Sequence, residues 1–437
     1  MKTVIMAGGR GTRISSVASD IPKPMIIIEG KPVLEREIDC LRNQGFTDLI
    51  ITVSHLADHI INYFGDGSSF GVKIDYFIEE NPLGNAGALI KLKDKLEDDF
   101  LLLNADSVFD IDFNRFVDYH KEKGGLVTLF THPNSHPYDS GVLIANAKGV
   151  VETWLTKEDV RPQWYKNRVN AGLHVINPAI LDKVDVDPER IGTKDDNGKI
   201  IKVDLDRQIL KPLCGTGTMF CYDSPEYVKD MGTPDRYKSV CEDYREGRVQ
   251  AKNLKNKQKA VFLDRDGTIN KYIGFLRNID EFELLPGVAD AIKIINTSGY
   301  LAIVVTNQPV IARGEVNFEQ LQEIHNKMET LLGKQGAYLD AIYFCPHHPH
   351  KGFKGEIHEF KIECGCRKPK PGMLIQAAED FNIDLSQSWM IGDGESDILA
   401  GKASGCKTAL IGSADYSQDL TVESLEEFVN KTIIWKD

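Results

Sequence analysis

The ten residues VFLDRDGTIN, Val261 to Asn270, decide how the second half of the chain folds. A short apolar run, typical of a buried strand, ends abruptly at Asp264, and Asp266 and Gly267 follow at once. Open α/β sheets bind their ligands where the strands end. A carboxylate there can attack a phosphoryl group while a second one transfers the proton, so we interpret Asp264 as a nucleophile and Asp266 as a general acid/base. A simple capped turn is the alternative, because Asp and Gly are common turn residues.

The composition limits the class of protein. The 437 residues carry a net charge of −13, and no basic stripe suited to a phosphate backbone is visible, so we expect no nucleic-acid partner. The N-terminus lacks a secretory apolar segment, and no run approaches the ~18 apolar residues of a membrane span. Eight cysteines in so long a chain do not suggest a disulfide framework. We therefore expect a cytoplasmic protein that does not bind membranes.

Two domains are expected. Both halves of the chain alternate short apolar strands with amphipathic helices, which predicts α/β architecture twice. A polar, basic stretch, REGRVQAKNLKNKQK (245–259), separates them. We predict a first domain over residues 1–250, a linker over 251–259 and a second domain over 260–437.

The first half opens with a predicted strand, Thr3 to Met6, that runs into AGGRGTR. Successive glycines present backbone N–H groups to an anion. The pattern fits neither the Walker A motif nor the dinucleotide fingerprint, so we predict a phosphate-binding loop of another kind, with a plain glycine-rich turn as the alternative. Lys23 follows on a rigid Pro-Lys-Pro segment, where a polyphosphate would need positive charge.

These stretches are followed by ENPLGNAG (80–87), LLLNADSVFD (101–110), VNAGLHVIN (169–177) and KDMGTPDRY (229–237). In this order they resemble the sugar-1-phosphate nucleotidyltransferases over about the first 240 residues. The resemblance implies a Rossmann-like mixed sheet and transfer of a nucleotidyl group from a nucleoside triphosphate to a sugar 1-phosphate. It also implies a Mg²⁺ ion held by Asp106 and Asp230.

The same resemblance assigns the remaining site residues of the first domain. Catalytic roles fall to Lys23 and Arg13, nucleotide binding to Gly8, Gly9, Gly11, Thr12, Glu80, Gly84, Gly87 and Asp106, and sugar binding to Asn170, Gly172 and Lys157. The chain departs from the family at Ala105, where a glycine is usual, and at Thr156-Lys157-Glu158, where the family commonly has an EKP triplet. The DMGTPDRY tail is most similar to the guanylyltransferase branch, so GTP is favoured, and another nucleoside triphosphate stays open.

In the second half, a predicted helix (287–296) and a predicted strand (300–305) lead to Thr306-Asn307-Gln308. Arg367-Lys368-Pro369 and WMIGDGESD (389–397) follow. Their order resembles the haloacid dehalogenase-like phosphatases across about 180 residues. The resemblance implies a Rossmannoid domain, in which Thr306 and Lys368 hold the phosphoryl group and Asn307 and Arg313 bind substrate. Asp264, the backbone carbonyl of Asp266, and Asp393 would share a Mg²⁺ ion.

A cysteine-rich insertion precedes Lys368. Three thiolates, at Cys345, Cys364 and Cys366, and one imidazole would form a closed tetrahedral set, which is typical of a structural zinc site. By spacing alone His347, His348, His350 and His358 are all possible ligands. A zinc loop directly before CRKPKPGM resembles the heptose bisphosphate phosphatases, with the histidinol-phosphate phosphatases as close kin. That resemblance selects His347 and implies that Arg367 contacts a second phosphate of the substrate.

One position departs from this family: Pro309 and Val310 stand where a Ser-Gly pair is common, and proline has no N–H to offer a ligand. Taken together, the two resemblances imply a bifunctional enzyme. It would remove the 7-phosphate of D-glycero-D-manno-heptose 1,7-bisphosphate and then couple the 1-phosphate product to GTP, giving GDP-heptose and pyrophosphate. Two alternatives stay open: a mannose- or other hexose-1-phosphate transferase joined to a histidinol-phosphate-like phosphatase, and an inactive sugar-nucleotide-binding regulatory module. The sequence does not specify an oligomeric state.

Overall fold

The computed structural model describes residues 1–9 and 21–434. The chain divides into two compact units. The first comprises residues 1–131, 143–154 and 170–253, and the second comprises residues 132–142, 155–169 and 254–437. The predicted linker, 251–259, begins at the last residue of α6 (Arg248–Ala251) and ends at Lys259, where the next strand starts. No helix among the described residues combines the length and the apolar character that a membrane crossing requires.

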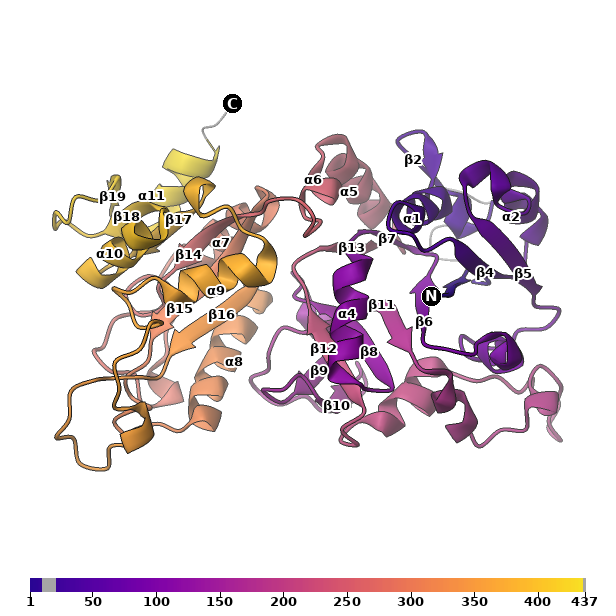
Figure 1. The fold of residues 1–437 in the computed structure, drawn as a ribbon, viewed down its shortest axis with the longest axis horizontal. Coiled ribbons are helices and arrows are strands. Elements are labelled where there is room, and N and C mark those ends of the chain that lie inside the picture. Colours follow the sequence, from indigo (N-terminus) through magenta and orange to yellow (C-terminus); the bar gives the residue numbers. More distant parts are fainter. Residues whose placement is uncertain (10–20, 435–437) are drawn as a thin grey trace. The chain divides into compact units, whose positions relative to one another are not determined.

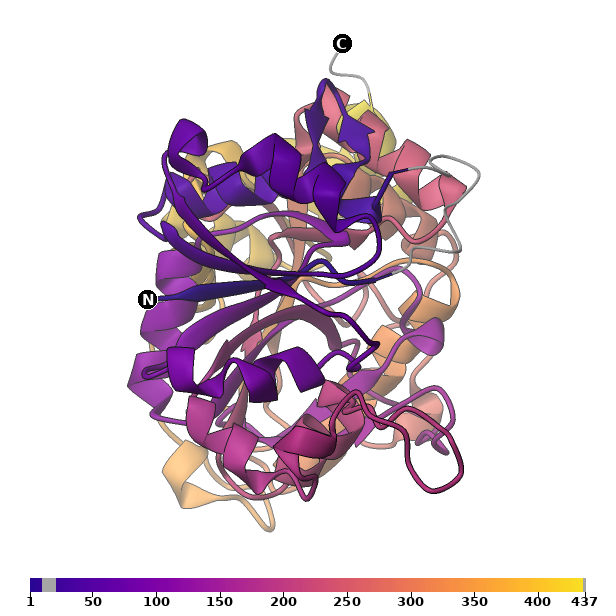
Figure 2. The same cartoon turned by 90° about the vertical axis from the view of Figure 1, so that its right-hand side faces the viewer.

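The first unit is built on a mixed sheet in the order β10-β9-β11-β6-β1-β4-β5, with β8 paired to β11 and β12 paired to β8. The strands β6, β1, β4 and β5 are parallel, whereas β11 runs antiparallel to β6. Figure 2 shows the indigo and purple strands of this unit with helices on either side of them. This arrangement confirms the Rossmann-like mixed sheet predicted from the sequence. The strands are β1 (Thr3–Met6), β4 (Asp48–Val53), β5 (Lys73–Ile78), β6 (Phe100–Asn104), β8 (Val127–His132), β9 (Val142–Ala145), β10 (Val151–Leu155), β11 (Val169–Ile176) and β12 (Met219–Asp223).

Helices cover both faces of this sheet because its central strands are apolar on both sides. Ile5, Leu101 and Leu103 pack against α1, α2 and α4, whereas Val4 and Leu102 face α3 and the segments around it. The helices are α1 (Val33–Arg42), α2 (Ala57–Phe64), α3 (Gly87–Lys91), α4 (Phe113–Lys123) and α5 (Pro234–Arg245). Two small ribbons complete the unit: β2 (Ile27–Ile28) with β3 (Lys31–Pro32), and β7 (Ser107–Asp110) with β13 (Tyr227–Asp230).

The second unit contains a parallel sheet in the order β16-β15-β14-β17-β18-β19 (Figure 1). Every adjacent pair in it is parallel, so all six strands end at one edge. The strands are β14 (Lys259–Leu263), β15 (Tyr300–Asn307), β16 (Ala341–Cys345), β17 (Trp389–Gly392), β18 (Lys407–Ile411) and β19 (Leu420–Val422). The sequence placed the first two of these strands correctly, and the structure extends each by two residues.

Alternate residues of β14 divide the core of this unit in two. Val261 and Leu263 pack against α7 (Val288–Thr297), α8 (Phe318–Lys334) and α11 (Leu425–Val429). Ala260 and Phe262 face the opposite layer, which contains α9 (Gly372–Phe381) and α10 (Glu395–Ser404). Residues 155–169 belong to this unit through α8, where the Thr330 hydroxyl accepts a hydrogen bond from the Tyr165 N–H and donates one to its carbonyl. The α/β class predicted for this half is confirmed.

Candidate active sites

The parallel register of the second unit brings the predicted phosphatase residues to one edge of the sheet. Asp264 directly follows β14, Thr306 is the penultimate residue of β15, and Asp393 directly follows β17. Because β14 lies between β15 and β17, these three residues lie on neighbouring strand ends. The apolar strand pattern around each of them therefore positions the site.

Lys368 joins this edge from the loop before α9. Its ammonium lies 2.8 Å from Asp264 Oδ1 and 2.6 Å from Asp397 Oδ1, and its side chain is only 2% exposed. The Asn307 side chain holds the backbone of the lysine in place. It accepts a hydrogen bond from the Lys368 N–H and donates one to the Lys368 carbonyl, each at 3.0 Å. Both hydrogen-bonding ends of the Asn307 amide are thus occupied by the chain itself.

The electrostatics of this site are those of several acids beside one buried cation. Burial raises the pKa of Asp264 to about 6; the Lys368 ammonium opposes that rise and Asp397 adds to it. Burial, followed by the charge of Asp264, likewise raises the pKa of Asp393 to about 6. Burial alone would lower the pKa of Lys368, but Asp264 and Asp397 together outweigh it and raise the pKa.

Three carboxylates in this site could hold a divalent cation. Oxygen atoms of Asp264, Asp393 and Asp397 all lie within 4.8 Å of one another. Hard oxygen ligands of this kind suit Mg²⁺. The Asp266 side chain is turned to other partners, chiefly the neighbouring Arg265, so its backbone carbonyl is the group it could offer to a metal ion.

Gly267 shows how closely this site is packed. Its φ is +84°, a backbone conformation that disfavours L side chains. A Cβ atom at this position would lie 2.0 Å from Asp393 Oδ2. Only glycine allows the loop after β14 to pass so close to the carboxylate of the next strand.

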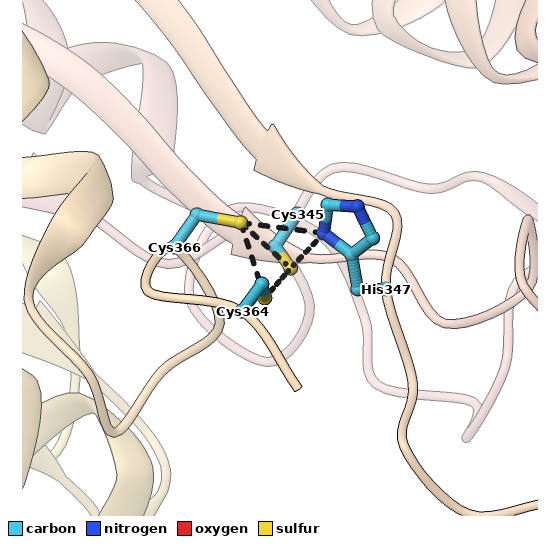
Figure 3. Close-up of side chains that lie close together, drawn as sticks. All are labelled: Cys345, His347, Cys364 and Cys366. Carbon is cyan, nitrogen blue, oxygen red and sulfur yellow. Dashed lines mark hydrogen bonds between the residues drawn. The ribbon is translucent and has the colours of Figure 1, made fainter. Parts of the chain in front are cut away.

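The four predicted zinc ligands form one cluster (Figure 3). The three sulfur atoms of Cys345, Cys364 and Cys366 lie 3.3–3.5 Å apart, and His347 Nδ1 lies 3.6 Å from Cys345 Sγ and 3.4 Å from Cys366 Sγ. These separations approach the edges of a tetrahedron with ligand bonds of about 2.0–2.3 Å, so the donor set fits zinc. His347, and not its rivals, completes the cluster.

Two arginines assigned to substrate binding lie beside the zinc loop. Arg367 donates a hydrogen bond of 3.1 Å to the His347 carbonyl. The Arg313 guanidinium is stacked between two aromatic rings, 3.9 Å from the centre of Phe275 and 4.2 Å from the centre of Phe353. Both cations are therefore fixed by the protein before any ligand binds.

The first unit contains a cavity of about 940 Å³ at the carboxyl ends of β1, β4 and β6. Seven of the residues predicted for the transferase site were assigned to the nucleotide or to catalysis and lie within the described chain. Of these, the cavity is lined by Gly8, Gly9, Lys23, Glu80, Gly84 and Asp106. Lys23 Nζ lies 2.8 Å from Asp106 Oδ2. Gly11, Thr12 and Arg13 fall outside the described residues.

The predicted metal ligands of this unit approach each other through a small ribbon. In the antiparallel pairing of β7 with β13, Asp230 lies opposite Ser107, the residue after Asp106. Asp230 is ion-paired with Arg236 and accepts a hydrogen bond from the Gly232 N–H. Both acids are about half exposed, so a hydrated Mg²⁺ ion could reach them.

Three glycines of this unit fit their places closely. Gly84 has φ +81°, and a Cβ atom there would lie 2.3 Å from the Val203 carbonyl oxygen. At Gly87 a Cβ atom would lie 2.7 Å from Leu83 Cβ, and at Gly172, with φ +77°, 2.5 Å from Asn104 Nδ2. The first two therefore serve the packing of the loop that walls the cavity.

The sugar-side residues have separate surroundings. Asn170 Oδ1 accepts hydrogen bonds of 3.1 Å from the Gly172 N–H and from His174 Nε2. Lys157 lies in residues 155–169 of the second unit, and its ammonium is 2.7 Å from Asp139 Oδ1, with both side chains exposed. The structure thus gives Lys157 an acidic partner within its own unit.

Some contributors were not assigned from the sequence. Asp397 lies in WMIGDGESD and was given no role from the sequence, yet it contacts Lys368. Its position in the first turn of α10, four residues after Asp393, is the feature of the sequence that could have indicated this contact. Arg265 contacts Asp266, its neighbour in the chain, and also His325, which lies far away in the sequence. No spacing in the sequence indicates that contact.

Comparison with known proteins agrees with both folds. A family model described as nucleotidyl transferase matches residues 2–247, and one described as HAD-hydrolase-like matches residues 365–432. The D-glycero-beta-D-manno-heptose-1,7-bisphosphate 7-phosphatase of Haemophilus ducreyi is 42% identical over 181 residues, which are 39% of this chain and 97% of that protein. The enzyme of the same name from Escherichia coli K12 is 42% identical over 152 residues, covering 35% of this chain and 78% of its own.

Among solved structures, HddC from Yersinia pseudotuberculosis is 27% identical with a TM-score of 0.46, covering 56% of this chain and 99% of its own. The folds, sites and family matches define a bifunctional enzyme with a nucleotidyltransferase domain and a HAD-like phosphatase domain. The chain belongs to the nucleotidyl transferase family and, through its C-terminal domain, to the family of the heptose-bisphosphate phosphatases.

The close fit of Gly267 gives a testable prediction. In Gly267→Ala the new methyl group collides with Asp393, and we expect phosphatase activity to fall about 100-fold, as a displacement of about 1 Å at a reacting centre can cause. The measurement is phosphate release at saturating Mg²⁺. Gly274→Ala is the matched control, because Gly274 has φ +82° but no atom within 4 Å of its would-be Cβ. Equal losses in the two variants would attribute the effect to backbone strain instead of the Asp393 contact.

Proposed function

We propose that the second unit removes the 7-phosphate of D-glycero-D-manno-heptose 1,7-bisphosphate and that the first unit transfers a guanylyl group from GTP to the resulting heptose 1-phosphate. The observation that carries this proposal is the presence of both families in one chain. The phosphatase relatives that the chain covers almost completely are named for the 1,7-bisphosphate. Their dephosphorylated product is a sugar 1-phosphate, the substrate class that the sequence resemblance implies for the first domain.

In the phosphatase reaction, Asp264 attacks the phosphorus of the 7-phosphate and the bond to the sugar oxygen breaks. Asp266 gives a proton to the leaving oxygen, and water then attacks the aspartyl-phosphate while Asp266 takes a proton from it. Lys368 faces Asp264 directly, so it balances the charge of the phosphoryl group during transfer. A Mg²⁺ ion held by Asp264, Asp393 and the Asp266 carbonyl would add further positive charge there.

The transferase reaction needs no covalent intermediate. A phosphate oxygen of the sugar 1-phosphate attacks the α-phosphorus of the nucleotide in line, and pyrophosphate leaves. Lys23 lies in the cavity beside Asp106, where it is placed to bind phosphate oxygens. A Mg²⁺ ion held by Asp106 and Asp230 would neutralise charge on the same phosphates. Asn170 and Gly172 would contact the sugar.

Substituting one acid in each domain tests the two-site proposal. Asp264→Asn should lower phosphate release by about three orders of magnitude, because an amide cannot act as the nucleophile. The same variant should still release pyrophosphate from GTP and supplied heptose 1-phosphate at the wild-type rate. Asp106→Asn should show the opposite pattern, so each variant controls for the folding of the other. A variant that loses both activities would contradict two independent sites.

The choice of nucleotide is tested by ligand-dependent stability. We propose GTP because the segment from Asp230 to Tyr237 resembles the guanylyltransferase branch. A ligand at 100 times its Kd stabilises the folded state by about 2.7 kcal/mol, so GTP should raise the melting temperature more than ATP, CTP, UTP or dTTP does. Heptose 1-phosphate and Mg²⁺ are present throughout, and Lys23→Ala should abolish the shift. A larger shift with another nucleotide would replace GTP in the proposal.

We also propose a structural zinc ion at Cys345, His347, Cys364 and Cys366, in a reducing compartment where the thiols stay free. The purified chain should contain about one zinc ion, measured by elemental analysis, and Cys364→Ala should contain about none. That variant should also lose phosphatase activity, because Arg367 and Lys368 directly follow the cluster, while transferase activity persists. Cys406→Ala, which removes a buried thiol outside the cluster, should keep its zinc. Full zinc content in Cys364→Ala would contradict the site.

A further inference from the structure

Arg265 is a fully buried arginine between the two acids of the phosphatase loop. Its guanidinium turns to its neighbour in the chain: Nη2 lies 2.9 Å from Asp266 Oδ1 and 2.7 Å from Oδ2, and Nε lies 3.3 Å from Oδ1. Burying a guanidinium is unfavourable unless it is paired and hydrogen-bonded. Asp266 provides that pairing, and in return its carboxylate is fixed in one orientation.

The other side of the guanidinium faces α8. His325 Nε2 lies 3.4 Å from Arg265 Nη1, and the imidazole is 2% exposed. Burial, and then the charge of Arg265, hold the pKa of His325 well below its usual range, so the ring is neutral and Nε2 can accept a hydrogen bond. The His325 ring also packs edge-on against Phe344, 5.7 Å between centres. The imidazole is therefore a fixed acceptor that determines where Arg265 lies.

Two amides complete the surroundings of Asp266. Asn270 Nδ2 donates to Oδ1 at 3.0 Å, and Gln308 Nε2 donates to Oδ2 at 3.2 Å. A carboxylate has about four lone-pair positions. The Arg265 guanidinium and the two amides together occupy those of Asp266. The Gln308 bond is the longer of the two amide bonds, and the same nitrogen has another acceptor, Thr306 Oγ1, at 2.9 Å. Gln308 is thus the donor that can most readily give up its place on Oδ2.

We propose that Arg265, held by His325, is a positioning residue that aims Asp266 Oδ2 at the leaving oxygen of the substrate. The inference rests on the proposed role of Asp266 as general acid/base. When substrate binds, Oδ2 carries a proton taken from water, as at the end of the second step below; it gives up the Gln308 bond and donates that proton to the leaving oxygen, while Arg265 and Asn270 keep the carboxyl plane fixed. In the first step the bond from Asp264 to phosphorus forms, the bond to the sugar oxygen breaks, and the Oδ2 proton moves to that oxygen. In the second step a water oxygen bonds to phosphorus, its proton moves to Oδ2, and Asp264 is released.

A pair of substrates isolates this role. An alkyl phosphate such as the heptose bisphosphate needs a proton on its leaving oxygen, whereas p-nitrophenyl phosphate releases a stabilised phenolate that does not. General acid catalysis contributes about 10²–10⁴-fold. We therefore expect Arg265→Gln to lower kcat/KM about 100-fold for the sugar phosphate and less than about threefold for the aryl phosphate. The readout is the ratio of kcat/KM for the sugar phosphate to kcat/KM for the aryl phosphate. Asp266→Asn, which removes the general acid itself, gives the largest change in this ratio that can be expected.

Graded variants follow the same contact. Arg265→Lys retains one charged donor and should recover part of the ratio. His325→Leu removes the acceptor and should shift the ratio in the direction of Arg265→Gln, whereas His325→Gln keeps an acceptor and should stay near wild type. Ile292→Ala, in the buried face of α7, is the control for lost stability and should affect both substrates equally.

Equal losses on both substrates in Arg265→Gln and His325→Leu would overturn the inference, because they would show a purely structural role. Wild-type activity on both substrates in these two variants would overturn it as well. The His325 pair keeps the test decisive should Arg265→Gln fail to fold. Failure of the proposed function is distinguishable, since the wild type would then hydrolyse p-nitrophenyl phosphate but not the heptose bisphosphate. The comparison would in that case use a primary alkyl phosphate that the wild type does hydrolyse.

Discussion

The buried ammonium of Lys368 between Asp264 and Asp397 is the interaction on which the phosphatase site depends. One buried ammonium lies beside three carboxylates, of which Asp397 is buried, Asp264 is half-buried and Asp393 is exposed. With every acid ionised, the group carries two surplus negative charges, and burial makes such a surplus unfavourable. The raised pKa values of Asp264 and Asp393 express that cost. A divalent cation would neutralise the surplus and keep the nucleophile ionised. The charges that destabilise the folded site without a metal ion would therefore favour the binding of Mg²⁺.

A lysine can be held in this position only if its backbone is fixed, and two separate devices fix it. Cys364 and Cys366 belong to the four-residue cluster, and Lys368 follows two residues later. Asn307, at the end of β15, clamps the Lys368 peptide with two hydrogen bonds of 3.0 Å. The cluster therefore limits where the loop can run, and the sheet sets its final register. A metal ion bound at that cluster would help to determine the geometry of Lys368, although it would lie away from the chemistry.

The sequence predicted those residues that sheet geometry brings together. Asp264, Thr306 and Asp393 each end an apolar strand, and parallel strands deliver their ends to one edge whatever the details of packing. The three cysteines of the cluster could be predicted because thiols in a short insertion fit one coordination geometry, whereas spacing left four histidines open and the family resemblance selected His347. The fold class followed from the same periodicity of strands and helices.

Side-chain direction was beyond the reach of such patterns. Asn307 was assigned to substrate binding, and the sequence did not indicate that its amide also holds the Lys368 backbone. Lys157 was assigned to the sugar phosphate, and the sequence did not indicate its contact with Asp139. From the sequence alone, Arg265 would be taken for an exposed charged residue in a loop. In the structure it is fully buried and contacts His325, sixty residues away in the sequence. Contacts of this kind are decided by tertiary packing, which a single sequence does not display.

The two sites treat phosphate in opposite ways, and the difference follows from what each must bind. The phosphatase needs only one phosphoryl group beside its nucleophile, and there Asp264 and Lys368 are only 14% and 2% exposed. The transferase must hold a nucleoside triphosphate and a sugar phosphate together. Its acids, Asp106 and Asp230, are 50% and 44% exposed, and Asp106 lines the cavity of about 940 Å³. The two sites lie at the edges of two different sheets, so the exposure of the acids in one site does not constrain their exposure in the other.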